Sequence, residues 1–230
     1  MKIFDLDVEK PNYLTRHKKV HGILAVLLSL VIAPILSAAI IAGSGANLVT
    51  TSISKIGWQN DWLVAVYFWG LYNLALFFYL LKLVLDEGQY DKKLKIAFYA
   101  VTAVSCVILL VGISIPFIND EIPTHMLMRK IHNGFATTGF VLFVVVLIAL
   151  TVTTLFRNKT QALISAGLLA FLIISGLFAV LCVNSPEHAT FITASAQMYI
   201  FSMLHILLAC QFFLNSVLPN EKCSVQSQRQ

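Results

Sequence analysis

Residues 135–155 read FATTGFVLFVVVLIALTVTTL, an unbroken run without Asp, Glu, Lys or Arg. A membrane-spanning helix needs about 20 predominantly apolar residues to cross the hydrocarbon core of a bilayer. Inside that core the backbone must satisfy its own hydrogen bonds, so a run of this length is expected to be helical. We therefore predict that this segment crosses a membrane as an α-helix.

Five other stretches have the same character and extend the prediction to most of the chain. They cover residues 22–42, 62–81, 96–117, 162–183 and 198–217, and none carries an internal acidic or basic residue. The short alternating segments of a membrane β-barrel are absent. The expected fold is an all-α integral membrane six-helix bundle over residues 22–217, between an N-terminal segment (1–21) and a tail (218–230).

The overall composition agrees with a membrane protein and argues against a soluble one. The chain has 230 residues, is 58% hydrophobic and only 12% charged, and its mean hydropathy is +0.83. An average soluble domain has about 25% charged residues. The net charge of +5 does not indicate a nucleic-acid partner, because Lys and Arg lie between the apolar runs and do not cluster on one face.

The distribution of Lys and Arg predicts how the helices are oriented. With the N-terminus in the cytoplasm, 13 of the 16 Lys and Arg residues fall on the cytoplasmic side. Only Lys55, Arg129 and Lys130 fall on the other side. Cytoplasmic loops of membrane proteins carry an excess of these residues. We therefore expect both termini in the cytoplasm and the three longer polar loops outside.

Histidines gather on the predicted outer side and are the main candidates for a functional site. His125, His132, His188 and His205 share that side with Asp61, Asp120, Glu121 and Glu187. His205 is expected about 10 Å below the start of the last helix, at 1.5 Å per residue. A histidine at that depth should face the bundle interior and have a partner. We expect His132 and His205 to face a common outward-opening pocket, as candidate catalytic residues.

Three interpretations of these histidines stay open at this stage. They could form a hydrogen-bonded cluster that fixes helix packing. They could act as general acid–base groups or hold zinc, with His125, His132, His205 and Glu187 as candidate ligands. They could also ligate a haem between the fourth and sixth helices through two imidazoles.

A second group of outer residues suggests contact with a lipid headgroup. Two Trp residues bracket a polar stretch just before the second predicted helix. Trp commonly lies at the membrane interface, and cations pair with anionic headgroups. The candidate substrate-binding residues are Lys55, Trp58, Asp61, Trp62, Arg129 and Asn133.

Three short motifs resemble a known family. They are Ser52-Ile53-Ser54-Lys55-Ile56-Gly57 before an aromatic second helix, Gly112-Ile113-Ser114-Ile115-Pro116-Phe117, and His132-Asn133. Together with six spans, they resemble domain-of-unknown-function family 998, small bacterial membrane proteins, and are distantly similar to the DRAM, FRAG and Sfk group. The resemblance covers about residues 20–215 and implies a bacterial plasma-membrane protein with an outer-face histidine at His132. Where the family tends to have an acidic residue, this chain has Lys55.

The sequence favours a multi-pass membrane protein with an outward-facing His and carboxylate pocket that binds or modifies a lipid or lipid-linked substrate. A non-enzymatic immunity, sensor or accessory protein with a protein partner is the alternative, and a bis-histidine haem electron carrier is a further one. No P-loop, GxSxG or HExxH motif occurs, so the sequence does not assign a reaction.

Overall fold

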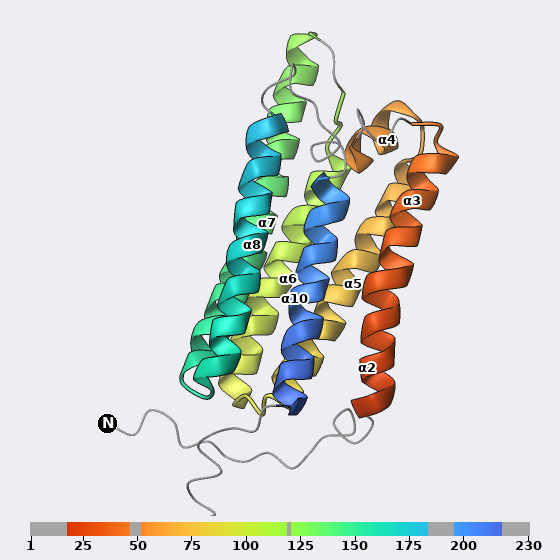
Figure 1. Cartoon of the computed structure of the whole chain (residues 1–230). Helices are drawn as coiled ribbons and strands as arrows, with labels where there is room; N and C mark the ends of the chain where they lie inside the picture. Colours follow the sequence, from red (N-terminus) through yellow and green to blue (C-terminus); the bar gives the residue numbers. More distant parts are fainter. Residues whose placement is uncertain (1–17, 47–51, 119–120, 184–195, 218–230) are drawn as a thin grey trace, which may run out of the picture.

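A computed structural model describes residues 18–46, 52–118, 121–183 and 196–217, and these form a bundle of long helices (Figure 1). Within this part of the chain no β-strand is present. The long helices after the first span are α5 (Leu63–Glu87), α6 (Lys92–Ser114), α7 (Pro123–Leu155), α8 (Lys159–Val183) and α10 (Ala196–Val217). The fold is therefore all-α, as the sequence predicts.

Six helical segments in the described residues are long and apolar enough to cross a membrane. They are Val20–Gly43, Leu63–Glu87, Lys92–Ser114, Pro123–Leu155, Lys159–Leu177 and Gln197–Ser216. All six correspond to the spans expected from the sequence, so the prediction of a multi-pass membrane protein is confirmed. Large apolar side chains such as Phe68, Leu163 and Ile174 are exposed on the outside of the bundle, where lipid would contact them.

The first span is built from three consecutive segments. α2 (Lys18–Val26) continues into a π-helical turn, η1 (Leu27–Ile32), and then into α3 (Ala33–Gly43). Pro34 stands in the first turn of α3. Proline has no backbone N–H and its ring collides with the carbonyl four residues earlier. A wider turn just before Pro34 accommodates both effects without ending the span.

Two differences from the sequence prediction shape one end of the bundle. A short helix, α4 (Ile53–Gln59), precedes α5 and lies near the end of α3 (Figure 1). Ser52 caps it, because its Oγ accepts a hydrogen bond from the backbone N–H of Lys55 at 3.3 Å. In addition, α7 begins at Pro123, 12 residues before the predicted start, and projects beyond its neighbours (Figure 1). We call this end of the bundle the α4 end.

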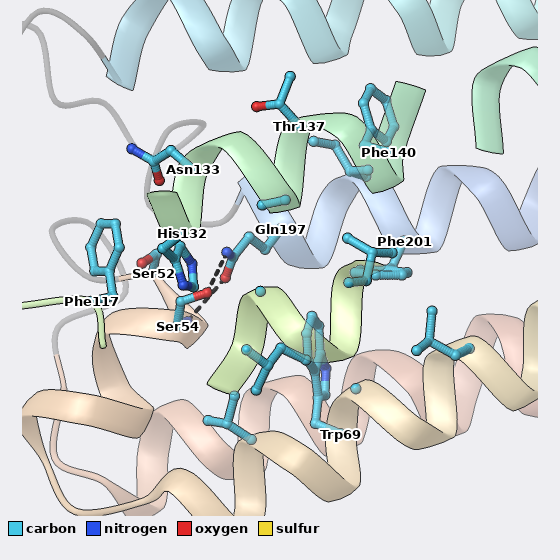
Figure 2. A pocket seen from close by; sticks show the side chains of 18 of the residues that line it. Ser52, Ser54, Trp69, Phe117, His132, Asn133, Thr137, Phe140, Gln197 and Phe201 are labelled. Carbon is cyan, nitrogen blue, oxygen red and sulfur yellow. Dashed lines mark hydrogen bonds between the residues drawn. The ribbon is translucent and has the colours of Figure 1, made fainter. Parts of the chain in front are cut away.

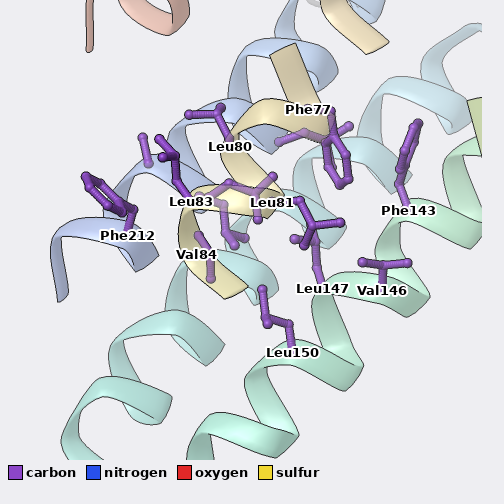
Figure 3. Close-up of a cluster of buried hydrophobic side chains, with 14 of the residues drawn as sticks. Phe77, Leu80, Leu81, Leu83, Val84, Phe143, Val146, Leu147, Leu150 and Phe212 are labelled. Atoms are coloured by element: carbon purple, nitrogen blue, oxygen red, sulfur yellow. The ribbon is translucent and has the colours of Figure 1, made fainter. Parts of the chain in front are cut away.

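The helices pack around an apolar core in which α10 is central. α10 contacts α5, α8 and the first span, while α6 packs mainly against α7. Phe77 and Phe143 are fully buried and their ring centroids lie 4.3 Å apart. Figure 3 shows these rings beside Leu80, Leu81 and Leu147. This core fills the bundle below the α4 end and forms the floor of the cavity described next.

Candidate functional site

A cavity of about 340 Å³ opens in the half of the bundle nearest the α4 end (Figure 2). Five elements supply its walls: α4, α5, α6, α7 and α10. It extends along α7 from His132 to Phe143, about 16 Å at 1.5 Å per residue. Pockets of about 300–1,000 Å³ with mostly apolar walls are typical ligand sites.

The polar residues of the cavity lie toward its α4 end, together with the apolar Val66, Ile113 and Phe117, whereas its deeper end is apolar. The polar lining residues lie at the starts of α4 and α10 and further along α7, whose first turns project beyond the cavity; they are Ser52, Ser54, His132, Asn133, Thr137 and Gln197. Deeper in the bundle the walls are Leu74, Leu109, Phe143 and Leu204. Three of these deeper side chains, Leu74, Phe143 and Leu204, are no more than 4% exposed, so the floor is closed.

A pair of hydrogen bonds fixes the polar end between α4 and α10. The backbone N–H of Ser54 donates to Oε1 of Gln197 at 3.1 Å, and Nε2 of Gln197 donates to Oγ of Ser54 at 2.7 Å (Figure 2). The side-chain amide of Gln197 therefore makes a hydrogen bond through its oxygen and another through its nitrogen. Because α4 and α10 are 143 residues apart in sequence at this contact, the pair ties the short helix to the bundle.

His132 lies at the same polar end and is almost completely buried. Its Nδ1 is 3.1 Å from the carbonyl oxygen of Ile115, and its ring packs at 5.0 Å from the Phe117 ring. A carbonyl oxygen only accepts, so Nδ1 carries the proton in the neutral ring and Nε2 is left as an acceptor. His132 therefore offers the cavity a lone pair.

His205 occupies a different position, and this corrects one expectation from the sequence. Its Nε2 is 3.0 Å from the carbonyl oxygen of Asn73, and the side chain is fully buried. His205 is not among the residues that line the cavity; Phe201 is, and its ring lies 6.4 Å from the His205 ring. His132 lines this cavity and His205 does not, so the expectation that the two share a pocket is wrong for this cavity.

In the part of the chain that the structure describes, the candidate metal ligands do not lie together. Among these residues no group of three or more His, Cys, Asp and Glu side chains could hold a metal ion. Glu187 lies outside the described residues, and so does His188. His125 lies in the projecting part of α7, about two turns before His132. The zinc site that includes Glu187 stays a prediction. For the haem alternative, ligation through Nε2 of His205 would first require its bond to Asn73 to break.

Of the six residues that the sequence predicts to contact a lipid headgroup, one lines the cavity and five do not. Asn133 lines it. Trp58 instead donates from Nε1 to the carbonyl oxygen of Ile113 at 3.2 Å, and the Trp62 ring packs against Gly43. The charged residues of the set lie elsewhere: Lys55 is half-buried on α4, Asp61 is exposed in the turn before α5, and Arg129 is half-buried on α7.

Sequence reasoning did not single out Ser54, Gln197, Trp69 or Phe201 as site residues. Trp69 is 5% exposed, donates from Nε1 to Oγ of Ser37 at 2.8 Å, and packs edge-on against Phe201 at 5.2 Å. A usable signal existed for Ser54, since Ser52 and Ser54 flank Ile53 in the motif before α5. Nothing local marked Gln197, because its role depends on a contact with distant α4.

Comparison with known proteins adds no relative: no family model, no curated protein and no solved structure matches the chain. The resemblance to domain-of-unknown-function family 998 therefore stays a prediction. The fold and the six spans define the class, which is a multi-pass α-helical membrane protein.

Proposed function

We propose that this protein binds an amphiphile, a membrane lipid or a lipid-linked molecule, in the cavity at the α4 end. The observation that carries the proposal is the order of the lining residues, with all the polar ones toward the α4 end and only apolar ones toward the floor. An amphiphile has the same order along its length. Its hydrocarbon part would contact Leu74, Phe143 and Leu204, while its head would meet Asn133 and Gln197.

Access to the cavity is supported by the exposure of its rim on α7. Asn133 and Thr137 both line the cavity and are exposed, one turn apart on the same face of the helix. A ligand could enter between helices from the bilayer without a change in the buried core. All lining residues except Ser52 and Phe117 lie in helices, which favours a preformed site.

The orientation of the helices in the membrane is proposed from the distribution of Lys and Arg along the sequence. With both termini in the cytoplasm, the starts of α5, α7 and α10 face outward, so the cavity lies in the outer leaflet. We propose a plasma-membrane location on this basis and on the family resemblance. The cavity would then sample lipids of the outer leaflet, or lipid-linked molecules carried there.

The direct test is to identify what the purified full-length chain carries. Native mass spectrometry in mild detergent should detect a lipid bound in a 1:1 complex. Ala136→Phe should remove it, because Ala136 lines the cavity and a phenyl ring would fill the space. Thr138→Phe is the matched control, since Thr138 is two residues further on α7, is exposed, and does not line the cavity. Equal lipid occupancy in both variants, with both folded, would contradict the proposal.

A further inference from the structure

The polar end of the cavity is lined by uncharged groups. Two hydroxyls on α4, one on α7, two amides and one imidazole make up the polar lining; the residues are Ser52, Ser54, Thr137, Asn133, Gln197 and His132. Of the residues that the structure describes, no Asp, Glu, Lys or Arg lines the cavity. This differs from the sequence expectation, in which Lys55 or Arg129 holds an anionic headgroup.

An ionised head would be costly at this position. Burying a charge without a counter-charge costs far more than burying a hydroxyl or amide that finds a hydrogen bond. Anionic ligands are normally met by Arg or Lys. Lys55 and Arg129 lie on α4 and α7, the helices that flank the polar end, yet neither lines the cavity. The lining therefore favours a ligand whose head carries no charge.

The hydrogen-bonding capacity at the polar end defines the head more closely. Ser54 and Gln197 bond to each other, and Nδ1 of His132 is taken by Ile115. These bonds leave unused the acceptor Nε2 of His132, the second N–H of Gln197 and the hydroxyl hydrogens of Ser52 and Ser54. Asn133 and Thr137 can each donate and accept as well. The complementary head both donates and accepts hydrogen bonds, as hydroxyl and amide groups do.

The shape of the apolar end limits the hydrocarbon part. A closed floor at Phe143 and Leu204 ends a cavity of about 340 Å³, near the lower limit of typical ligand sites. The rings of Phe140, Phe201 and Trp69 also line the cavity (Figure 2). A volume of this size is better matched to one chain than to the paired chains of a bilayer lipid.

We propose that the cavity selects a single-chain amphiphile with an uncharged head that carries hydroxyl or amide groups, such as a monoacylglycerol. This inference rests on the proposed function and names the chemical class of its ligand. It assigns the acceptor role to His132 and the donor and acceptor roles to Asn133 and Thr137. No chemical change of the ligand is implied.

The test compares three lipids that share an oleoyl chain, titrated into the delipidated full-length protein. Monooleoylglycerol should bind at least about 10-fold more tightly than oleoyl lysophosphatidic acid, a difference of about 1.4 kcal/mol. It should also bind more tightly than dioleoylglycerol, which has two chains. Tighter or equal binding of lysophosphatidic acid would overturn the uncharged head, and equal binding of dioleoylglycerol would overturn the single chain. Both results would leave the proposed function intact; absence of binding by all three lipids, with no co-purified lipid, would overturn both.

Two neighbouring threonines provide a matched pair of variants. Thr137 lines the cavity and Thr138 does not, although both are exposed on α7. Thr137→Val removes one hydroxyl and should weaken monooleoylglycerol binding about 2- to 12-fold, the range for one hydrogen bond. Thr138→Val makes the same chemical change outside the cavity and should leave the affinity unchanged. Equal effects of the two variants would contradict the assignment of Thr137 to the head.

Discussion

His205 bonds through Nε2 to the main-chain carbonyl oxygen of Asn73, 3.0 Å away, and this contact joins the interior of α10 to the interior of α5. Both residues are buried, at 0% and 2% exposure. Because a carbonyl oxygen accepts, Nε2 is the protonated nitrogen of the neutral ring. The contact gives His205 a role in helix packing and separates it from His132.

Replacement of His205 should therefore affect stability more than ligand binding. His205→Ala removes a hydrogen bond worth about 0.6–1.7 kcal/mol within a membrane and also leaves a cavity. We expect the free energy of unfolding to fall by about 2–4 kcal/mol, measured by denaturant unfolding in detergent. The folded fraction should bind lipid with unchanged affinity. Normal stability combined with lost lipid binding would show that His205 belongs to the ligand site.

A buried ion pair at the opposite end of the bundle gives a second prediction. Nζ of Lys95 lies 3.0 Å from Oδ1 of Asp86, with side chains 14% and 6% exposed. Removal of one partner leaves a charge with reduced compensation in a buried place. Asp86→Ala should lower the free energy of unfolding by about 3 kcal/mol.

The double variant Asp86→Leu with Lys95→Met serves as its control. Since both charges are then replaced by apolar groups, most of the lost stability should return. Denaturant unfolding in detergent compares the free energy of unfolding of the single and double variants. A double variant as unstable as Asp86→Ala would mean that the pair's own attraction, and not the orphaned charge, dominates.

Two glycines on α7 should respond oppositely to alanine. A Cβ at Gly139 would lie 2.5 Å from Cγ of Leu109, so α6 and α7 could no longer approach as closely. Gly139→Ala should destabilise the protein by about 1–3 kcal/mol through overpacking. At Gly134 no atom lies within 4 Å of the added Cβ, so Gly134→Ala should be neutral or stabilising by about 0.5–1 kcal/mol. Thermal unfolding compares the two, and a similar loss in both would contradict this close packing.

The orientation is tested by reporters fused to the C-terminus. Green fluorescent protein folds in the cytoplasm, whereas alkaline phosphatase becomes active outside it. With 13 of the 16 Lys and Arg residues assigned to the cytoplasmic side, the fluorescent fusion should be bright and the phosphatase fusion inactive. The reverse pattern would place the cavity in the inner leaflet.

The spans could be predicted from the sequence because each is a long uncharged run, a signal set by the bilayer itself. The early start of α7 could not, since residues 123–134 include Arg129, Lys130 and two histidines and lower the local hydropathy. Pro123 stands in the first turn of that helix, a position that proline favours, but proline alone does not distinguish a helix start from a loop. α4 has 7 residues, which is too short for a membrane span, so the search for long apolar runs does not find it.

The residues that line the cavity can be predicted from the sequence only in part. His132 and Asn133 line the cavity, as the sequence suggested. The depth of His205 in its span predicts that it joins them, but the rotation of α10 about its axis directs the His205 ring to Asn73. Helix rotation depends on packing against neighbours, which a single sequence does not reveal. The same limit applies to Gln197, whose partner Ser54 lies on a distant helix.

Fluorescence of Trp69 tests the central claim, that a lipid chain occupies the cavity, most directly. Trp69 lines the cavity and is only 5% exposed, so lipid outside the bundle has little contact with it. The chain has three Trp residues, and Trp58→Phe with Trp62→Phe leaves Trp69 as the sole emitter. Monoacylglycerol with a brominated chain should quench this emission in a saturable manner, and Ala136→Phe should abolish the saturable part. Quenching that rises linearly with lipid and is the same in both proteins would contradict the account.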